Sequence, residues 1–324
     1  MNNGGKRSKI LVTRKLPPGA EEGFAAAFDC QFNSDDAPMS ADAIVAAAQG
    51  RIGIALTSMD KFPASLIDRL PEGVKILATV SVGHEHIDLA AAKSKNLVVT
   101  NTPGVLTDAT ADIALLLLLG AARGASWGDR MVRENRWPGF SIVAPLGSDV
   151  TQMRLGILGM GRIGVAVAKR AKAFGMTLHY HNRKAAAEAD ALGAIYHPTF
   201  EGMLPHCDFL SINCPMTLET KGIINSHSLA LLPKGAIVVN TARGGVVVDE
   251  DLIAALQSGH LAAAGLDVFN NEPKIDPRYR NLENVFMLPH LGSATPRTRT
   301  DMGLRALSNM KEYFSGKNPT DRLV

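Results

Sequence analysis

Residues 154–183 read RLGILGMGRIGVAVAKRAKAFGMTLHYHNR and are the most informative part of the sequence for predicting the architecture. A short apolar run leads through a GxGxxG motif into an alanine-rich segment, and a second apolar run follows. This order predicts a strand, a turn, a helix and a strand within about 30 residues, the context in which the motif binds a dinucleotide. The first glycine turns tightly, the second lets the backbone approach a pyrophosphate at the helix N-terminus, and the third permits close packing. The candidate cofactor contacts in this turn are Gly159, Gly161, Arg162, Ile163 and Gly164.

The end of the second apolar run predicts which dinucleotide binds. A site for NAD places an Asp or Glu about 20 residues beyond the motif, where it binds the adenosine ribose. This chain has Asn182, Arg183 and Lys184 there instead. Arg183 can form a forked, charge-assisted pair with a 2′-phosphate, and Asn182 can donate to it. We therefore expect NADPH as the cofactor, with NAD possible at lower affinity; the alternative is that these residues are surface charges at a strand end.

Length and composition describe an ordinary two-domain protein. The chain has 324 residues, of which 46% are hydrophobic and 20% charged, with a formal net charge of +3. Scattered basic residues give no footprint for nucleic acid or an anionic membrane, so a small-molecule partner is expected. The three cysteines form no CxxC pair, and the polar first nine residues resemble a loose tail and no signal peptide. We expect a cytoplasmic protein in a reducing compartment.

Two series of alternating strand-like and helix-like segments divide the chain. The first contains apolar runs at 9–13, 53–57, 75–79 and 97–100, and the second begins near Arg154. Between them, Thr107 opens a segment so uniformly apolar that it predicts a buried helix. The polar, helical segment from Ala294 is long enough to return to the first series. The pattern predicts two doubly wound parallel sheets, with one domain formed by residues 1–104 and 295–324 and the other by 105–294.

Four further segments suggest the chemistry. They are SVGHEHIDL at 81–89, VNTARGG at 239–245, GLDVF at 265–269 leading to Glu272-Pro273, and LPHLGSAT at 288–295. Together with the glycine motif they closely resemble the D-isomer-specific 2-hydroxyacid dehydrogenase family over nearly the whole chain, and they look most like its NADPH-dependent glyoxylate and hydroxypyruvate reductases. The resemblance implies a Rossmann cofactor domain inserted in a flavodoxin-like substrate domain.

The resemblance implies that Arg243, Glu272 and His290 are the catalytic trio, and the chemistry suits them. Hydride delivery to a keto carbon leaves negative charge on its oxygen, which needs a proton donor and a fixed positive group. A histidine titrates near neutral pH and can supply the proton, with Glu272 as its carboxylate partner. Arg243 stays charged at any working pH, so it can hold the substrate carboxylate and polarise the carbonyl.

Other roles follow from the resemblance alone. The backbone amides near Val82 and Gly83 would bind the substrate carboxylate, and Asp267 would orient the nicotinamide. Three of these residues also have structural alternatives. Asp267 could simply end a strand, Thr107 could be a helix N-cap, and Trp137 could be a packing anchor. His84 and His86 form an HxH pair without a third ligand, so no metal is expected. The remaining cofactor contacts implied are Thr107, Cys214, Pro215, Thr241, Ala242, His290 and Gly292, while Arg243 and Trp137 would contact the substrate.

The expected activity is reduction of small 2-keto acids to D-2-hydroxy acids. The resemblance also implies a homodimer, formed in part by the extended segment ENRWPGF that contains Trp137. No residue fixes the pocket size, so bulkier keto acids remain an alternative substrate class. Formate and phosphoglycerate dehydrogenases fit less well, because the first typically have longer chains and the second often carry a regulatory domain. A different class of function is a nucleotide-sensing binding protein, as in the corepressors that resemble this family.

Overall fold

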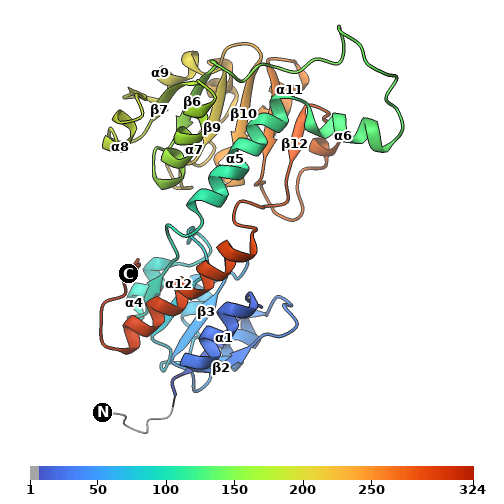
Figure 1. The fold of residues 1–324 in the computed structure, drawn as a ribbon. Helices are drawn as coiled ribbons and strands as arrows, with labels where there is room; N and C mark the ends of the chain where they lie inside the picture. Colours follow the sequence, from blue (N-terminus) through green and yellow to red (C-terminus); the bar gives the residue numbers. More distant parts are fainter. Residues whose placement is uncertain (1–6) are drawn as a thin grey trace. The chain divides into compact units, whose positions relative to one another are not determined.

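The computed structural model describes residues 7–324, and this part of the chain forms two compact units (Figure 1). Unit 1 contains two chain segments, the described residues up to Leu106 and Ala294–Val324. Unit 2 contains Thr107–Ser293. The sequence predicted boundaries after residue 104 and before residue 295. Most of the expected N-terminal tail, residues 1–6, lies outside the described residues, and Lys9 already belongs to the first strand.

Unit 1 is built on a five-stranded sheet in which every strand pairs in parallel, in the order β2-β1-β3-β4-β5. This is the flavodoxin-like order. Its strands are β1 (Lys9–Val12), β2 (Asp29–Phe32), β3 (Gly53–Leu56), β4 (Ile76–Thr79) and β5 (Val98–Thr100). Its helices are α1 (Pro18–Ala27), α2 (Ala41–Ala47), α3 (Ala64–Ile67), α4 (Leu89–Ser94) and α12 (Pro296–Phe314).

Both faces of this sheet are covered, and alternate residues of each strand enter different cores. In β3, Ile54 packs in a cluster with α2, α3 and α4, whereas Ala55 packs in a cluster with α1 and α12. Continuous apolar strands are the consequence of burial on both faces. Helix α12 therefore packs against the sheet of the N-terminal series.

Unit 2 contains a seven-stranded parallel sheet in the order β12-β11-β10-β9-β6-β7-β8. Taken in chain order, six of these strands have the arrangement of a Rossmann fold, and β12 extends the edge. The strands are β6 (Arg154–Leu158), β7 (Thr177–His181), β8 (Ile195–His197), β9 (Phe209–Ile212), β10 (Ala236–Asn240), β11 (Leu261–Leu266) and β12 (Val285–Met287). The two wound parallel sheets confirm the predicted fold class.

The helices of unit 2 cover both faces of its sheet. One face packs against α5 (Thr107–Ala122) and α7 (Arg162–Ala173), and the other packs against helices of the β9 to β11 crossovers. The remaining helices are α6 (Ala125–Arg133), α8 (Ala187–Asp190), α9 (Phe200–Met203), α10 (Ser226–Ala230) and α11 (Asp249–Gln257), with short 3-10 turns η1 (Leu204–His206), η2 (Gly244–Val246) and η3 (Pro277–Asn281).

Helix α5 is the uniformly apolar segment, and it lies in the core of unit 2. A Cβ added at Gly265 of β11 would come within 2.8 Å of Leu117. The glycine therefore lets the strand pack directly against the backbone of the helix. Among residues 7–324, no single helix is long and apolar enough to cross a membrane; α5 and α6 reach that length only as a pair bent by 69°.

Candidate active site

The glycine turn after β6 forms as the sequence predicted. Gly159 has φ +95 and lies against the chain after β9, because a Cβ there would come within 2.6 Å of the Cys214 nitrogen. A Cβ at Gly164 would come within 2.2 Å of the Gly159 oxygen, so the helix packs directly on the turn. A Cβ at Gly161 would meet nothing within 4 Å. The open space therefore lies at Gly161, where the phosphates of a dinucleotide are expected.

The start of α7 suits an anion. Gly161 is its N-cap and, having no side chain, gives the first amides of the helix no capping hydrogen bond. Arg162 is exposed at the same turn, and Ile163 is partly buried beside the unit 2 core. Helix N-terminal amides and their dipole favour a negative group.

The basic segment after β7 lies near the loop after β9. Arg183 and Lys184 are exposed, and the half-buried Asn182 donates from Nδ2 to the Lys184 oxygen at 3.3 Å. Across from them, the pKa of Glu219 is lowered, first by its hydrogen bond from Thr217 and also by the positive charge of Arg183. Arg183 is thus close enough to the β9 loop, which continues from the buried Cys214 and the exposed Pro215, to interact with it electrostatically.

The end of β10 supplies a fixed turn. Asn240 accepts from the Ala242 amide at 2.9 Å and donates to the Arg243 oxygen at 3.0 Å, which fixes the backbone that carries the Arg243 side chain. That side chain donates to the Ala242 oxygen at 2.7 Å. Thr241 is 8% exposed, and its hydroxyl oxygen is among the few buried side-chain polar atoms in residues 7–324 without a hydrogen-bond partner.

The orphaned Thr241 hydroxyl, the open space at Gly161 and the uncapped start of α7 all belong to turns at the carboxyl ends of β6 and β10. Ligands of open α/β sheets bind outside this edge of the sheet. A buried hydroxyl without a partner costs free energy that a ligand can relieve. These residues fit a nicotinamide dinucleotide, which is the cofactor their sequence predicted.

His290 and Glu272 form a close pair. His290 Nδ1 lies 2.7 Å from Glu272 Oε2, and Glu272 Oε1 accepts from the Phe269 amide at 2.7 Å. The imidazole is 46% exposed, so its second nitrogen can reach solvent or a ligand. Burial would raise the pKa of Glu272, but the bonds from His290 and Phe269 and the nearby charges of His290 and Arg243 outweigh it and lower the pKa. The structure thus brings the three residues of the predicted trio into one electrostatic site.

Asp267 holds the turn that carries His290. Its carboxylate is 1% exposed and accepts from the amides of Leu291 at 2.6 Å and Gly292 at 2.8 Å, while its backbone oxygen accepts from the His290 amide at 2.9 Å. His290 has φ +56, a conformation that non-glycine residues adopt mainly where surrounding contacts enforce it. Burial raises the pKa of Asp267, and the two amide bonds oppose that rise. Both carboxylate oxygens therefore bind backbone amides of the His290 turn. The resemblance had implied only a role in orienting the nicotinamide.

Sequence reasoning missed two residues of this arrangement. Thr110 in α5 donates to the Gly292 oxygen at 3.1 Å and so contacts the turn that Asp267 also holds. The Asn213 side-chain oxygen, at the end of β9, is a second buried polar atom without a partner among residues 7–324. Asn213 directly precedes the predicted contacts Cys214 and Pro215, which was the available signal. Nothing in the sequence indicated Thr110.

The remaining predicted residues belong to other segments of the chain. Thr107 is the first residue of α5, and Trp137 is 62% exposed in the irregular segment 134–149. Val82 and Gly83 belong to unit 1, in the loop after β4. Nearby, His86 Nε2 contacts Thr79 Oγ1 at 3.0 Å, and no group of three His, Cys, Asp or Glu side chains within residues 7–324 is arranged to hold a metal ion.

A Rossmann sheet with this glycine turn and a histidine–glutamate pair beside an arginine defines an NAD(P)-binding dehydrogenase. Residues 115–292 match the model of the D-isomer specific 2-hydroxyacid dehydrogenase NAD binding domain. Glycerate dehydrogenase of Hyphomicrobium methylovorum is 40% identical over 312 residues, which are 96% of this chain and 97% of that protein. The chain belongs to the D-isomer specific 2-hydroxyacid dehydrogenase family.

Solved structures agree with this assignment. A D-isomer specific 2-hydroxyacid dehydrogenase from Polaromonas has a TM-score of 0.92 and 42% identity, with 99% of this chain and all of that chain covered. The NADPH-dependent glyoxylate/hydroxypyruvate reductase of Sinorhizobium meliloti, in complex with NADP and malonate, has a TM-score of 0.88 and 34% identity over 98% of this chain and 97% of that chain.

Proposed function

We propose that this enzyme reduces small 2-keto acids, with glyoxylate and hydroxypyruvate as its main substrates, to D-2-hydroxy acids and prefers NADPH. The observation that carries the proposal is the 2.7 Å contact of His290 with Glu272 beside the charge of Arg243. The glycerate dehydrogenase and the glyoxylate/hydroxypyruvate reductase among its relatives support the substrate class, since glycerate is reduced hydroxypyruvate.

The cofactor supplies a hydride when bound; the protein must supply a proton and a binding site for the acid. Because the ionised Glu272 accepts a hydrogen bond, His290 carries a proton on Nδ1, and a second proton on Nε2 is available for the keto oxygen. Arg243 stabilises the negative charge that develops on that oxygen and holds the substrate carboxylate. The amides near Val82 and Gly83 are the groups of unit 1 that we assign to carboxylate binding.

NADPH preference rests on Arg183. It is exposed, and the segment Asn182 to Lys184 contains no carboxylate that would repel a 2′-phosphate. We expect Arg183→Ala to raise KM for NADPH by about 10- to 100-fold, the value of one charge-assisted contact, and to leave KM for NADH unchanged. Arg170→Ala is a matched control, because Arg170 pairs with Asp108 and Asp112 on α5. Equal losses with both cofactors would contradict the role of Arg183.

The substrate proposal is tested by following NADPH or NADH consumption with glyoxylate, hydroxypyruvate, pyruvate and phenylpyruvate. Fastest turnover of the first two with NADPH is the expected result. Faster turnover of phenylpyruvate would assign the bulkier keto acids instead. Tight NADPH binding without turnover of any of the four would contradict the reductase proposal and favour a nucleotide-sensing role.

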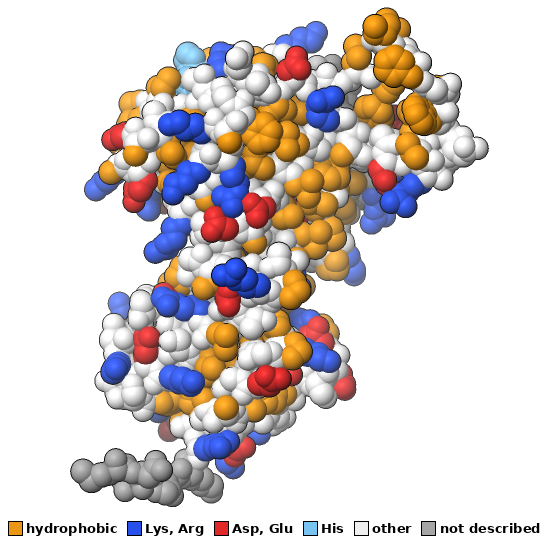
Figure 2. Space-filling view, viewed as in Figure 1, with side chains coloured by type: hydrophobic (Ala, Val, Ile, Leu, Met, Phe, Trp, Pro, Cys, Tyr) orange, Lys and Arg blue, Asp and Glu red, His pale blue; other side chains and the backbone are white. Residues whose placement is uncertain are grey.

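We also propose a homodimer formed through residues 134–149. This arm exposes several large apolar side chains to solvent, and Figure 2 shows hydrophobic side chains gathered over the segment that follows α6. They are Trp137, Phe140, Ile142, Val143 and Leu146, which are 62 to 90% exposed. An apolar surface of this kind favours a protein contact. Analytical ultracentrifugation of Phe140→Asp should show monomers where the parent protein forms dimers, and a monomeric parent would overturn the proposal.

A further inference from the structure

Two buried side chains hold the loop after β4 by its carbonyl groups. Asn101, which is 9% exposed, donates from Nδ2 to the Val82 oxygen at 2.8 Å. Ser81, which is 6% exposed, donates from Oγ to the Gly83 oxygen at 2.7 Å. Both carbonyls of the Val82–Gly83 segment are thus directed toward the interior of unit 1.

Peptide geometry converts this restraint into a direction for an N–H group. The Val82 carbonyl and the Gly83 N–H belong to one planar trans peptide, so they point in opposite directions. When Asn101 holds the carbonyl, the Gly83 N–H points away from Asn101. Among the hydrogen bonds of residues 7–324, the Gly83 N–H has no acceptor. It is therefore a donor with a fixed direction and without an acceptor in the described part of the chain.

Asn101 is itself held on its backbone. Its oxygen accepts from Nδ2 of Asn309 in α12 at 3.0 Å, and its amide donates to the Asp321 oxygen at 3.3 Å. Asn309 is fully buried and also donates to the Asp321 carboxylate, which pairs with Arg305 at 2.5 Å. Because the backbone of Asn101 is fixed at two points, its side-chain Nδ2 group is also restricted in position.

We propose that Asn101 is a positioning residue for the substrate carboxylate, which it controls by directing the Gly83 N–H. The proposal rests on the proposed function, in which this loop binds the carboxylate of a 2-keto acid. Asn101 does not touch the substrate; it makes the amide available before the substrate arrives. An N–H directed in advance binds an anion more tightly than one that must first be reoriented.

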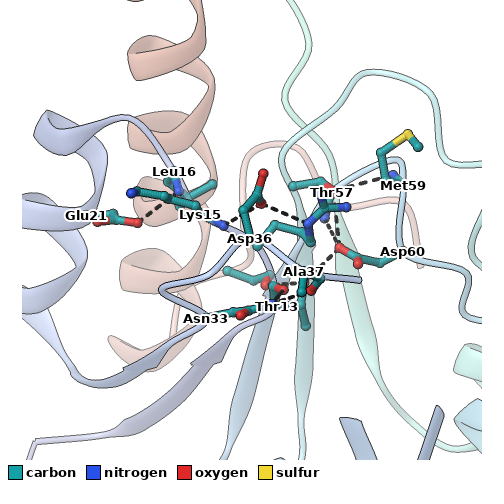
Figure 3. Close-up of polar contacts among 12 residues, drawn as sticks. Thr13, Lys15, Leu16, Glu21, Asn33, Asp36, Ala37, Thr57, Met59 and Asp60 are labelled. Carbon is teal, nitrogen blue, oxygen red and sulfur yellow. Dashed lines mark hydrogen bonds and ion pairs between the residues drawn. The ribbon is translucent and has the colours of Figure 1, made fainter. Parts of the chain in front are cut away.

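The test compares Asn101→Ala with Asn33→Ala. Asn33 is a matched control because its Nδ2 also donates to loop carbonyls of unit 1, those of Thr13 at 2.9 Å and Ala37 at 2.7 Å (Figure 3). We expect Asn101→Ala to raise KM for glyoxylate by about tenfold, the equivalent of one hydrogen bond, with kcat within about twofold and NADPH affinity unchanged. Asn33→Ala should lower Tm without changing KM.

A second variant and a binding assay keep the test decisive. Asn101→Asp has the same shape but no donor, so it should reproduce the rise in KM even if the alanine variant folds poorly. Titration of the NADPH-loaded protein with oxalate, a dicarboxylate that is not reduced, measures the carboxylate site without turnover. If the parent protein binds oxalate but reduces no keto acid, the proposed function fails, and a weaker affinity in Asn101→Asp still supports this role.

Three results would overturn the proposal. One is an unchanged KM and oxalate affinity in both Asn101 variants. The second is an equal rise in KM in Asn33→Ala, which would indicate a general effect of loop destabilisation. The third is a parent protein that neither turns over a keto acid nor binds oxalate, because there would then be no carboxylate site to position.

Discussion

The turn that carries His290 in unit 2 and the loop Val82–Gly83 in unit 1 are held in opposite ways. Each follows the carboxyl end of a parallel strand, β12 in one case and β4 in the other. In unit 2 a buried carboxylate, Asp267, accepts hydrogen bonds from two backbone amides of the turn. In unit 1 two neutral groups, those of Asn101 and Ser81, donate hydrogen bonds to backbone carbonyls.

The difference follows from what each segment must present. The unit 2 turn presents a side chain, the imidazole of His290, so its backbone N–H groups can be used to fix it. The unit 1 loop presents an N–H group, so it must be fixed through its carbonyls. An acceptor is needed in the first case and a donor in the second; a carboxylate supplies the first, and an amide and a hydroxyl supply the second.

The largest expected effect comes from removing what the unit 2 turn presents. His290→Ala should lower kcat by about 10³-fold, a typical contribution of a general acid, and spare NADPH binding. His227→Ala is the control, because His227 is exposed on α10. Steady-state kinetics and a fluorescence titration with NADPH measure the two quantities. Turnover near the parent rate would show that His290 is not the proton donor.

The second effect tests the anchor of that turn. Asp267→Asn keeps one accepting oxygen and places an NH2 group opposite the other amide, so the turn loses a charge-assisted bond. We expect kcat to fall by about 10- to 100-fold. Thermal stability should change little, because the variant no longer buries a carboxylate whose pKa burial raises. A loss of Tm without a loss of kcat would show that the carboxylate serves folding alone.

A smaller effect is expected at the neutral anchor of unit 1. Ser81→Ala removes the donor to the Gly83 oxygen but leaves Asn101 in place, so KM for glyoxylate should rise by only about two- to fivefold. Because Ser81 Oγ donates to Gly83, it accepts from Thr79, which in turn accepts from His86 Nε2. His86→Phe removes the far end of this chain and should affect KM less than Ser81→Ala. A larger rise in KM for His86→Phe than for Ser81→Ala would contradict this order of hydrogen bonds.

The smallest effect on activity is expected in a histidine cluster that includes none of the predicted site residues. His179 lies 3.0 Å from His197 through ring nitrogens, and burial, followed by the charges of His197 and His206, lowers its pKa from 6.5 to about 4. A histidine with a lowered folded-state pKa stabilises the fold above pH 6.5, and this contribution is lost as pH falls toward 4. Tm should therefore fall less steeply over this range in His179→Leu than in the parent protein, with kcat unchanged near pH 7. Parallel Tm curves would contradict this account.

Strands with continuous apolar runs could be predicted from the sequence, and two edge strands could not. β2 and β8 lie at the edges of their sheets and read DCQF and IYH, with exposed or half-buried residues. Edge strands are covered less, so selection for apolar residues is weaker and their pattern resembles a loop. Helix α6 was also missed; none of its residues is buried in the described part of the chain.

The site shows the same limit. Residues whose chemistry is distinctive, such as Arg243 and His290, could be named from their motifs. Thr110 and Asn101 could not, because their function depends on contacts to Gly292 and Val82 that only the folded chain brings within reach. A threonine in an apolar helix and an asparagine after a strand are ordinary residues in sequence. The side chains proposed for the chemistry were therefore easier to name from the sequence than those that hold the neighbouring backbone.

The glycine turn allows folding to be separated from cofactor recognition. Gly159 and Gly164 are packed against other chain atoms, so a methyl group at either would disrupt the turn itself. Gly161 has ordinary backbone angles and free space around its Cα, so Gly161→Ala should fold normally and occupy only the volume meant for the phosphates. Gly161→Ala would therefore give a folded variant that does not bind the dinucleotide. In that variant the turn that carries His290 and the loop Val82–Gly83 should each keep its conformation.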